Sequence, residues 1–212
     1  MPVSRTEYIE QQGFLTDIQM FERYQTKEKQ FKQLADITLI GHSLFDMWSD
    51  CEIYPPNLKG KSIANLGISG ISSFQYLDIL IRPQYIEHLG KTVFVFLGVN
   101  DILKEIEYSP KKVSEWLTEI FDSLVGISPE SQYFLLELTP VLNCEKVKNT
   151  QIRELNSYLK SHCPKRVNFI ETYRTFADEQ HNLRRELTTD GVHFTAKGYE
   201  LLRSLLLPYI PD

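Results

Sequence analysis

Two short stretches of the sequence hold residue types that can act together as a nucleophile and its base. The stretch LIGHSLFDMWSD, residues 39–50, places Ser43 directly after an apolar run that ends at Gly41. Far along the chain, TTDGVHFTAKGY places Asp190 three residues before His193. A serine hydroxyl becomes a useful nucleophile when a base removes its proton, and an imidazole oriented by a carboxylate is such a base. These side chains predict nucleophilic catalysis by serine, with an ordinary turn serine as the alternative.

Two further residues are candidates for stabilising the negative charge that develops on an acyl oxygen during such a reaction. Gly67 and Asn100 each follow an apolar run, in NLGISG and LGVND. The backbone N–H of Gly67, the Asn100 amide and the N–H of Ser43 would form an oxyanion hole, and each such donor is worth ~10²–10³ in rate. Glycine and asparagine are also common in turns, which is the structural alternative. Asp101 is expected to cap or anchor a loop.

Five short apolar runs must position these polar residues. Most are rich in β-branched and aromatic side chains, which is typical of strands buried on both faces of a parallel sheet. They are ITLIG (37–41), SIANLG (62–67), TVFVFLG (92–98), YFLLELT (133–139) and VNFI (167–170). Helical patterns separate or follow them, at 72–88 (with a possible break at Pro83), 111–126, 150–162 and 198–209. The alternation predicts an α/β fold with helices on both faces of a parallel sheet, whose strands end at one edge.

The region before the first strand has a helical pattern of its own. Within residues 14–35, six apolar residues are spaced three, four or seven apart, namely Phe14, Ile18, Phe21, Tyr24, Phe31 and Leu34. This stripe predicts a helix that docks on the core, with a partner-binding helix as the alternative. No linker follows it, so we expect one domain overall, in which residues 1–36 pack against a catalytic unit at 37–212.

The longest irregular piece is DMWSDCEIYPPNLKGK, residues 46–61. It follows the first expected strand, and loops at the carboxyl ends of parallel strands build active sites. Trp48 lies in this loop, close to Ser43, and is a candidate for stacking on a sugar or acyl group of the substrate. A buried aromatic side chain that packs the loop is the alternative.

The net charge and the cysteine content indicate which class of partner and which cellular compartment to expect. The net charge of −5 over 212 residues argues against nucleic acid as the main partner. The three cysteines, Cys51, Cys144 and Cys163, are odd in number and have no metal-ligand spacing, which fits a reducing compartment. The beginning of the chain lacks the pattern of a signal peptide, and no apolar run approaches ~18 residues. We therefore expect a cytoplasmic protein with no membrane span; the sequence indicates no oligomeric state.

The motifs, taken together and in order, resemble those of the SGNH (GDSL) hydrolase superfamily. IGHSLFD, NLGISG, LGVND and DGVHF are similar to four blocks of that family, and LTPV (138–141) is similar to the segment after its fourth strand. The resemblance covers about residues 37–207. It implies a three-layer α/β/α, flavodoxin-like fold with a five-stranded parallel sheet. It also implies hydrolysis of esters or thioesters without a metal or organic cofactor.

The resemblance also assigns roles to residues. Ser43 would be the nucleophile, His193 the base and Asp190 its partner. The N–H groups of Ser43 and Gly67, with the Asn100 amide, would form the oxyanion hole. These roles predict a serine esterase for a small-molecule or carbohydrate ester with a short acyl group, such as an O-acetyl sugar.

One departure from the family pattern keeps other functions open. The family usually has Asp before the nucleophile, whereas this chain has His42. A lysophospholipase, a thioesterase or an acyltransferase would use the same acyl-enzyme. A non-catalytic binding relative is the alternative from another class, and His42 is its only sign in the sequence.

Overall fold

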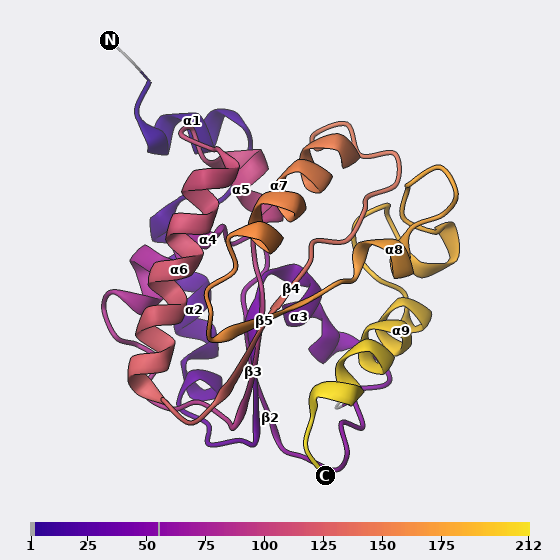
Figure 1. Cartoon of the computed structure of the whole chain (residues 1–212). Helices are drawn as coiled ribbons and strands as arrows, with labels where there is room; N and C mark the ends of the chain where they lie inside the picture. Colours follow the sequence, from indigo (N-terminus) through magenta and orange to yellow (C-terminus); the bar gives the residue numbers. More distant parts are fainter. Residues whose placement is uncertain (1–2, 55) are drawn as a thin grey trace.

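A parallel sheet of five strands forms the centre of the computed structural model, which describes residues 3–54 and 56–212 (Figure 1). The strands are β1 (Ile37–Gly41), β2 (Ile63–Gly67), β3 (Thr92–Phe96), β4 (Gln132–Leu136) and β5 (Val167–Ile170). Their order is β2-β1-β3-β4-β5, and every pairing is parallel. All residues of β1, β2 and β3 are buried, which explains why these strands are mainly hydrophobic. The predicted strands are confirmed: β1 and β5 have the predicted bounds, and the other three have ends that differ by up to three residues.

Helices cover both faces of this sheet and complete a three-layer, flavodoxin-like fold (Figure 1). On one face lie α2 (Asp17–Phe31), α4 (Ser73–Tyr76) and α6 (Pro110–Ile127), with α7 (Asn149–Ser161) beside α6. On the other face lie α3 (Ser43–Asp46) and α9 (Ala196–Leu206). The remaining elements are short: α1 (Arg5–Gln11), η1 (Met47–Asp50), η2 (Leu77–Ile81), α5 (Val99–Lys104), α8 (Tyr173–Phe176), η3 (Arg185–Leu187) and η4 (Leu207–Tyr209).

The segment before β1 differs from the single helix predicted over 14–35. Its longest helix, α2, begins only at Asp17, because the Thr16 side chain and that of Gln19 cap its first turn reciprocally. It packs on the core through Met20, Tyr24 and Phe31. Two of the residues expected in the stripe, Ile18 and Leu34, are instead 73% exposed.

Two other helical predictions need adjustment. The pattern at 72–88 forms a helix only as far as Ile81, in α4 and the π-helical turn η2, so it ends before Pro83. The six residues of α5 were not predicted, because so short a helix has no apolar period to read. Among the described residues, no helix combines the length and the hydrophobicity needed to cross a membrane.

Candidate active site

Ser43 is the first residue of α3 and follows β1 after a single intervening residue, His42. The His42 Nδ1 accepts a hydrogen bond of 3.3 Å from the N–H of Leu44, so it caps this helix. Burial, and next the charge that His193 can carry, lower the pKa of His42 to about 3. His42 therefore stays neutral near pH 7. It keeps the capping acceptor that the family's usual Asp would supply.

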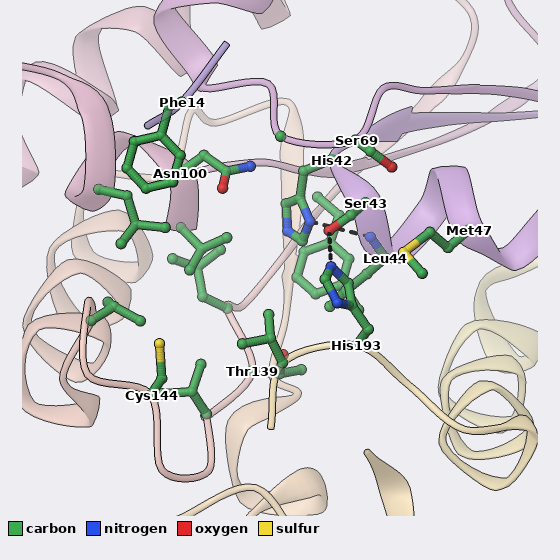
Figure 2. A pocket seen from close by; sticks show the side chains of 18 of the residues that line it. Phe14, His42, Ser43, Leu44, Met47, Ser69, Asn100, Thr139, Cys144 and His193 are labelled. Carbon is green, nitrogen blue, oxygen red and sulfur yellow. Dashed lines mark hydrogen bonds between the residues drawn. The ribbon is translucent and has the colours of Figure 1, made fainter. Parts of the chain in front are cut away.

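A relay of two hydrogen bonds connects Ser43 to the loop before α9. Ser43 Oγ lies 3.1 Å from His193 Nε2, and His193 Nδ1 lies 2.6 Å from Asp190 Oδ2 (Figure 2 shows the first contact). The other Asp190 oxygen accepts the N–H groups of Val192 and His193. Burial alone would raise the pKa of Asp190, but these hydrogen bonds outweigh it and lower the pKa to about 2. The ionised carboxylate can hold the imidazole with Nε2 free to take the Ser43 proton.

Gly191 allows the tight turn that brings Asp190 and His193 together. Its φ is +96°, and a Cβ at this position would lie 2.1 Å from the carbonyl oxygen of Leu142. Its N–H donates to the Thr188 hydroxyl at 2.8 Å. Only glycine fits such a backbone pressed against a neighbouring loop. The spacing of Asp190 and His193 in DGVH therefore depends on the glycine backbone between them as well as on the hydrogen bond between their side chains.

The relay opens into a cavity of about 370 Å³. Figure 2 shows Ser43 and His193 on one side of it and Phe14 on the other. Most of the wall is apolar, and its lining includes Phe14, Leu44, Met47, Phe96, Val99, Leu103, Leu138, Val141, Val147 and Val192. Asn100, Thr139, Arg23 and Gly70 add polar groups to the lining. A small ester with its carbonyl at Ser43 fits such a chamber.

Gly67 does not lie where the sequence reasoning expected it. Its N–H donates to Asn65 Oδ1 at 3.1 Å, and its carbonyl accepts a hydrogen bond from Lys27. It is absent from the cavity lining, because it sits where α3 packs on β2: a Cβ there would lie 2.6 Å from the Asp46 nitrogen. Gly67 is therefore a packing glycine.

Gly70, three residues later in the same NLGISG motif, lines the cavity with a φ of +82°. Among the described residues, no hydrogen bond occupies the N–H of Gly70 or of Ser43. Asn100 also lines the cavity, and its amide donates to the Ile71 carbonyl at 2.9 Å, which leaves its second hydrogen available. The structure thus brings Ser43, Asn100 and Gly70 to one cavity.

Trp48 is not a cavity residue, which corrects the prediction that it contacts substrate. Its side chain is 0% exposed and stacks between Phe45 and Tyr199, with ring centroids 6.4 Å and 5.5 Å away. The loop 46–61, of which residue 55 lies outside the described residues, contributes Met47 to the cavity instead. Because α3 continues directly into η1, Trp48 turns toward α9 and fills the space between the two helices.

A comparison with family models gives a match that includes Ser43, Gly70, Asn100, Asp190 and His193. The model of the GDSL-like lipase/acylhydrolase family matches residues 41–201. The chain belongs to this family. It is accordingly a hydrolase that acts on ester bonds.

Individual relatives of this acylhydrolase carry different names. The chain is 34% identical over 192 residues to an N-acylneuraminate cytidylyltransferase of Escherichia coli, a match that covers 86% of this chain and 42% of that protein. It thus spans less than half the length of that relative. It is 25% identical over 180 residues to platelet-activating factor acetylhydrolase IB subunit alpha1 of Rattus norvegicus, covering 81% and 75% of the two chains. A GDSL-like lipase of Bacteroides thetaiotaomicron shares the fold, with a TM-score of 0.70, 21% identity and coverage of 90% and 96%.

In this acylhydrolase, side chains of α5 form hydrogen bonds to the loop that carries Gly70. Besides the Asn100 contact to Ile71, Lys104 Nζ donates to the Gly70 carbonyl at 2.9 Å. Asp101 accepts the N–H of Ser73 at 2.9 Å, as expected of a loop anchor. Burial lowers the pKa of Lys104 to about 8, and burial, with Glu105 nearby, raises the pKa of Asp101 to about 7. Sequence reasoning missed Lys104, because only the fold shows which carbonyl it meets.

We expect Trp48→Phe to lower the free energy of unfolding by ~1–3 kcal/mol, because the smaller ring leaves space between α3 and α9. The KM for a short ester should stay within about twofold of the native value. Urea unfolding and steady-state kinetics check the two parts. An increase in KM with unchanged stability would instead indicate that Trp48 contacts the substrate.

Asn100→Ala should lower kcat by ~10²–10³ with a small change in melting temperature, because the loop stays anchored by Asp101 and Lys104. Asn100→Asp is the matched control, since it keeps the shape but replaces the donor with an acceptor. It should be at least as damaging. A native kcat in either variant would remove Asn100 from the oxyanion hole.

Lys104→Met keeps the apolar stem but leaves the buried carbonyl of Gly70 without its donor. We expect kcat to fall by ~10–10²-fold while KM changes little, because Lys104 acts through the Gly70 peptide and does not line the cavity. A loss of stability alone, with native kcat, would show that Lys104 only supports the fold.

The same variant tests the burial of Lys104 through pH. Because the folded-state pKa is lowered from 10.5 to about 8, the residue contributes stability above pH 10.5 that is lost as the pH falls through about 8. As the pH rises from about 8 to 10.5, the free energy of unfolding of the native protein should therefore increase relative to that of Lys104→Met. Urea titrations at several pH values measure the difference, and a flat difference would contradict the shifted pKa.

Proposed function

We propose that this chain is a serine esterase that removes short acyl groups, such as O-acetyl groups on a carbohydrate, through an acyl-enzyme on Ser43. The observation that carries the proposal is the relay from Ser43 through His193 to Asp190, which opens into a mainly apolar cavity. The distance of 3.1 Å between Ser43 Oγ and His193 Nε2 supports catalysis over the alternative of a non-catalytic binding relative.

In the first half of the reaction, Ser43 Oγ attacks the ester carbonyl while His193 Nε2 takes its proton. Negative charge develops on the former carbonyl oxygen, where the N–H groups of Ser43 and Gly70 and the Asn100 amide would stabilise it. Gly70 takes this role in place of Gly67. As the intermediate collapses, His193 gives its proton to the leaving alcohol and the acyl group remains on Ser43.

In the second half, a water molecule replaces the alcohol. His193 takes a proton from this water, which attacks the acyl-enzyme, and the same oxyanion donors act again. Collapse returns the proton to Ser43 and releases the carboxylic acid. Asp190, ionised throughout, stabilises the imidazolium that forms in each half.

The choice of a short acyl group on a sugar is supported by the cavity and by two of the relatives. A chamber of about 370 Å³ holds a small ester more readily than a long chain. One relative is named as an acetylhydrolase and the other for an acylated sugar, N-acylneuraminate. Arg23 at the cavity wall donates to the Ser69 carbonyl and has no carboxylate partner among the described residues, which suits an acidic sugar. Three free cysteines favour a reducing compartment such as the cytoplasm.

Hydrolysis of p-nitrophenyl esters with acyl chains of two to twelve carbons tests the proposal. The native protein should prefer acetate, and Ser43→Ala should lose activity by several orders of magnitude without unfolding, because the nucleophile is gone. Acetylated sugars are tested next, and the acetate released from them is measured.

Cys51→Ala is the matched control, because it removes another nucleophile near the same loop that does not line the cavity. It should keep native activity and the same labelling of Ser43 by an organophosphonate. Turnover that survives Ser43→Ala, or labelling at another residue, would refute the serine mechanism.

A further inference from the structure

The segment before α2 lies outside residues 41–201, which match the acylhydrolase family, yet it reaches the active-site cavity. Phe14 is its contribution to the wall. Figure 2 shows the Phe14 ring at the side of the cavity opposite His193. A residue from outside the family unit therefore closes the far end of the chamber.

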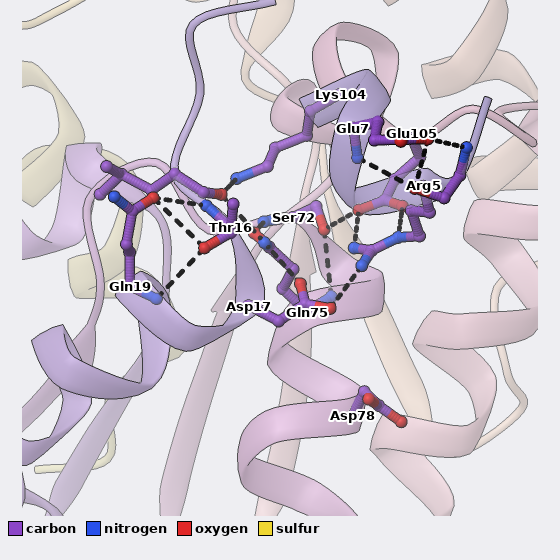
Figure 3. A network of polar contacts seen from close by, with 12 residues as sticks. Arg5, Glu7, Thr16, Asp17, Gln19, Ser72, Gln75, Asp78, Lys104 and Glu105 are labelled. Atoms are coloured by element: carbon purple, nitrogen blue, oxygen red, sulfur yellow. Dashed lines mark hydrogen bonds and ion pairs between the residues drawn. The ribbon is translucent and has the colours of Figure 1, made fainter. Parts of the chain in front are cut away.

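A buried ion pair anchors the beginning of this segment. Arg5 donates two hydrogen bonds to the Glu105 carboxylate, at 2.7 Å and 2.8 Å, and a third to Asp17 (Figure 3). The Glu105 side chain is 2% exposed and also accepts the hydroxyl of Ser72. Such a bidentate pair fixes orientation as well as distance. The segment is thus tied to the residue that follows α5.

A second anchor lies directly beside Phe14. The carbonyl of Leu15 accepts hydrogen bonds from Lys104 Nζ at 3.1 Å and from the Gln75 amide at 3.3 Å (Figure 3 shows Lys104 and Gln75). Lys104 is the side chain that also holds the Gly70 carbonyl. The backbone next to Phe14 is therefore held by the same ammonium group as the candidate oxyanion loop.

Phe14 also meets the loop after β4. Lys146 Nζ lies 4.6 Å from the centre of the Phe14 ring, and the same group donates to the Gln12 carbonyl at 3.3 Å. Cys144 and Val147 of this loop line the cavity. The ring is thus held between the loop after β4 and the segment's own anchors.

We propose that Phe14 is a specificity-determining residue, the end wall that limits the length of the group bound between it and Ser43. The N-terminal segment acts as a strap whose anchors at Arg5 and Leu15 keep this wall in place. The inference rests on the proposed esterase function and explains why the cavity would favour short groups. A longer chain would have to displace the Phe14 ring, and the hydrogen bonds to the neighbouring Leu15 and Gln12 carbonyls oppose such displacement.

The test compares chain-length profiles of the native protein, Phe14→Leu and Phe14→Ala. The acyl series is p-nitrophenyl acetate to dodecanoate, and a second series of acetate esters varies the alcohol. The ratio of kcat/KM for the octanoate ester to that for the acetate ester should rise from the native protein to Phe14→Leu and again to Phe14→Ala. If the alcohol is the group that reaches Phe14, the corresponding ratio in the alcohol series should rise in the same order. Each methylene newly accommodated should add about fourfold. Acetate itself should change little, because it does not reach Phe14.

Phe21→Ala is the matched control, because it removes the same ring from a partly buried site that does not line the cavity. Its profile should equal the native one. Arg5→Met tests the strap, and it should shift the profile in the same direction as Phe14→Ala with a smaller amplitude.

An unchanged length profile in both ester series for a folded Phe14→Ala would overturn the proposal, as would an equal shift in Phe21→Ala. The outcome is separable from the proposed function. Inactivity of the native protein toward every ester would reject the esterase, while acetate hydrolysis with an unaltered profile would reject only the end wall. Calorimetric binding of the carboxylates from acetate to dodecanoate gives the same comparison without turnover.

Discussion

Helix α5 and the residue after it meet the loop that follows β2 through four side chains, and the rest of the site depends on these contacts. Asn100 holds the Ile71 carbonyl, Asp101 the N–H of Ser73, Lys104 the Gly70 carbonyl and Glu105 the Ser72 hydroxyl. Two of the three proposed oxyanion donors, Asn100 and Gly70, therefore belong to elements that are joined directly to each other. Preorganised donors stabilise charge most when they need not move during the reaction, and this joint supplies that rigidity.

The contacts between α5 and the loop after β2 include charged groups that are costly to bury. Lys104 and Asp101 are almost fully buried and have pKa values shifted toward their neutral forms, to about 8 and about 7. In other proteins, replacing buried charges with well-packed apolar residues is often neutral or stabilising. Backbone carbonyl and N–H groups of a loop, however, can be held only by polar partners. The sequence therefore uses buried charge where a loop must keep one conformation.

The sequence predicts the parts of this molecule that depend on local pattern. The apolar runs predict the five strands, of which β1, β2 and β3 are buried throughout, and the DGVH turn predicts the neighbourhood of Asp190 and His193. It does not distinguish Gly67 from Gly70, because both stand in one motif and differ only in the folded structure, where Gly70 lines the cavity with a positive φ and Gly67 packs against α3. It does not predict the direction of Trp48 either, since that depends on how α3 continues into η1.

The relay also has an order of assembly. Asp190 and His193 belong to one turn, whereas Ser43 lies 150 residues earlier than His193 in the chain. During synthesis, Ser43 leaves the ribosome long before His193 is made. In the proposed mechanism, the serine of a nascent chain is therefore not activated, and hydrolysis begins only when the turn before α9 docks beside β1. Activity would then show that the last helical layer has packed on the sheet.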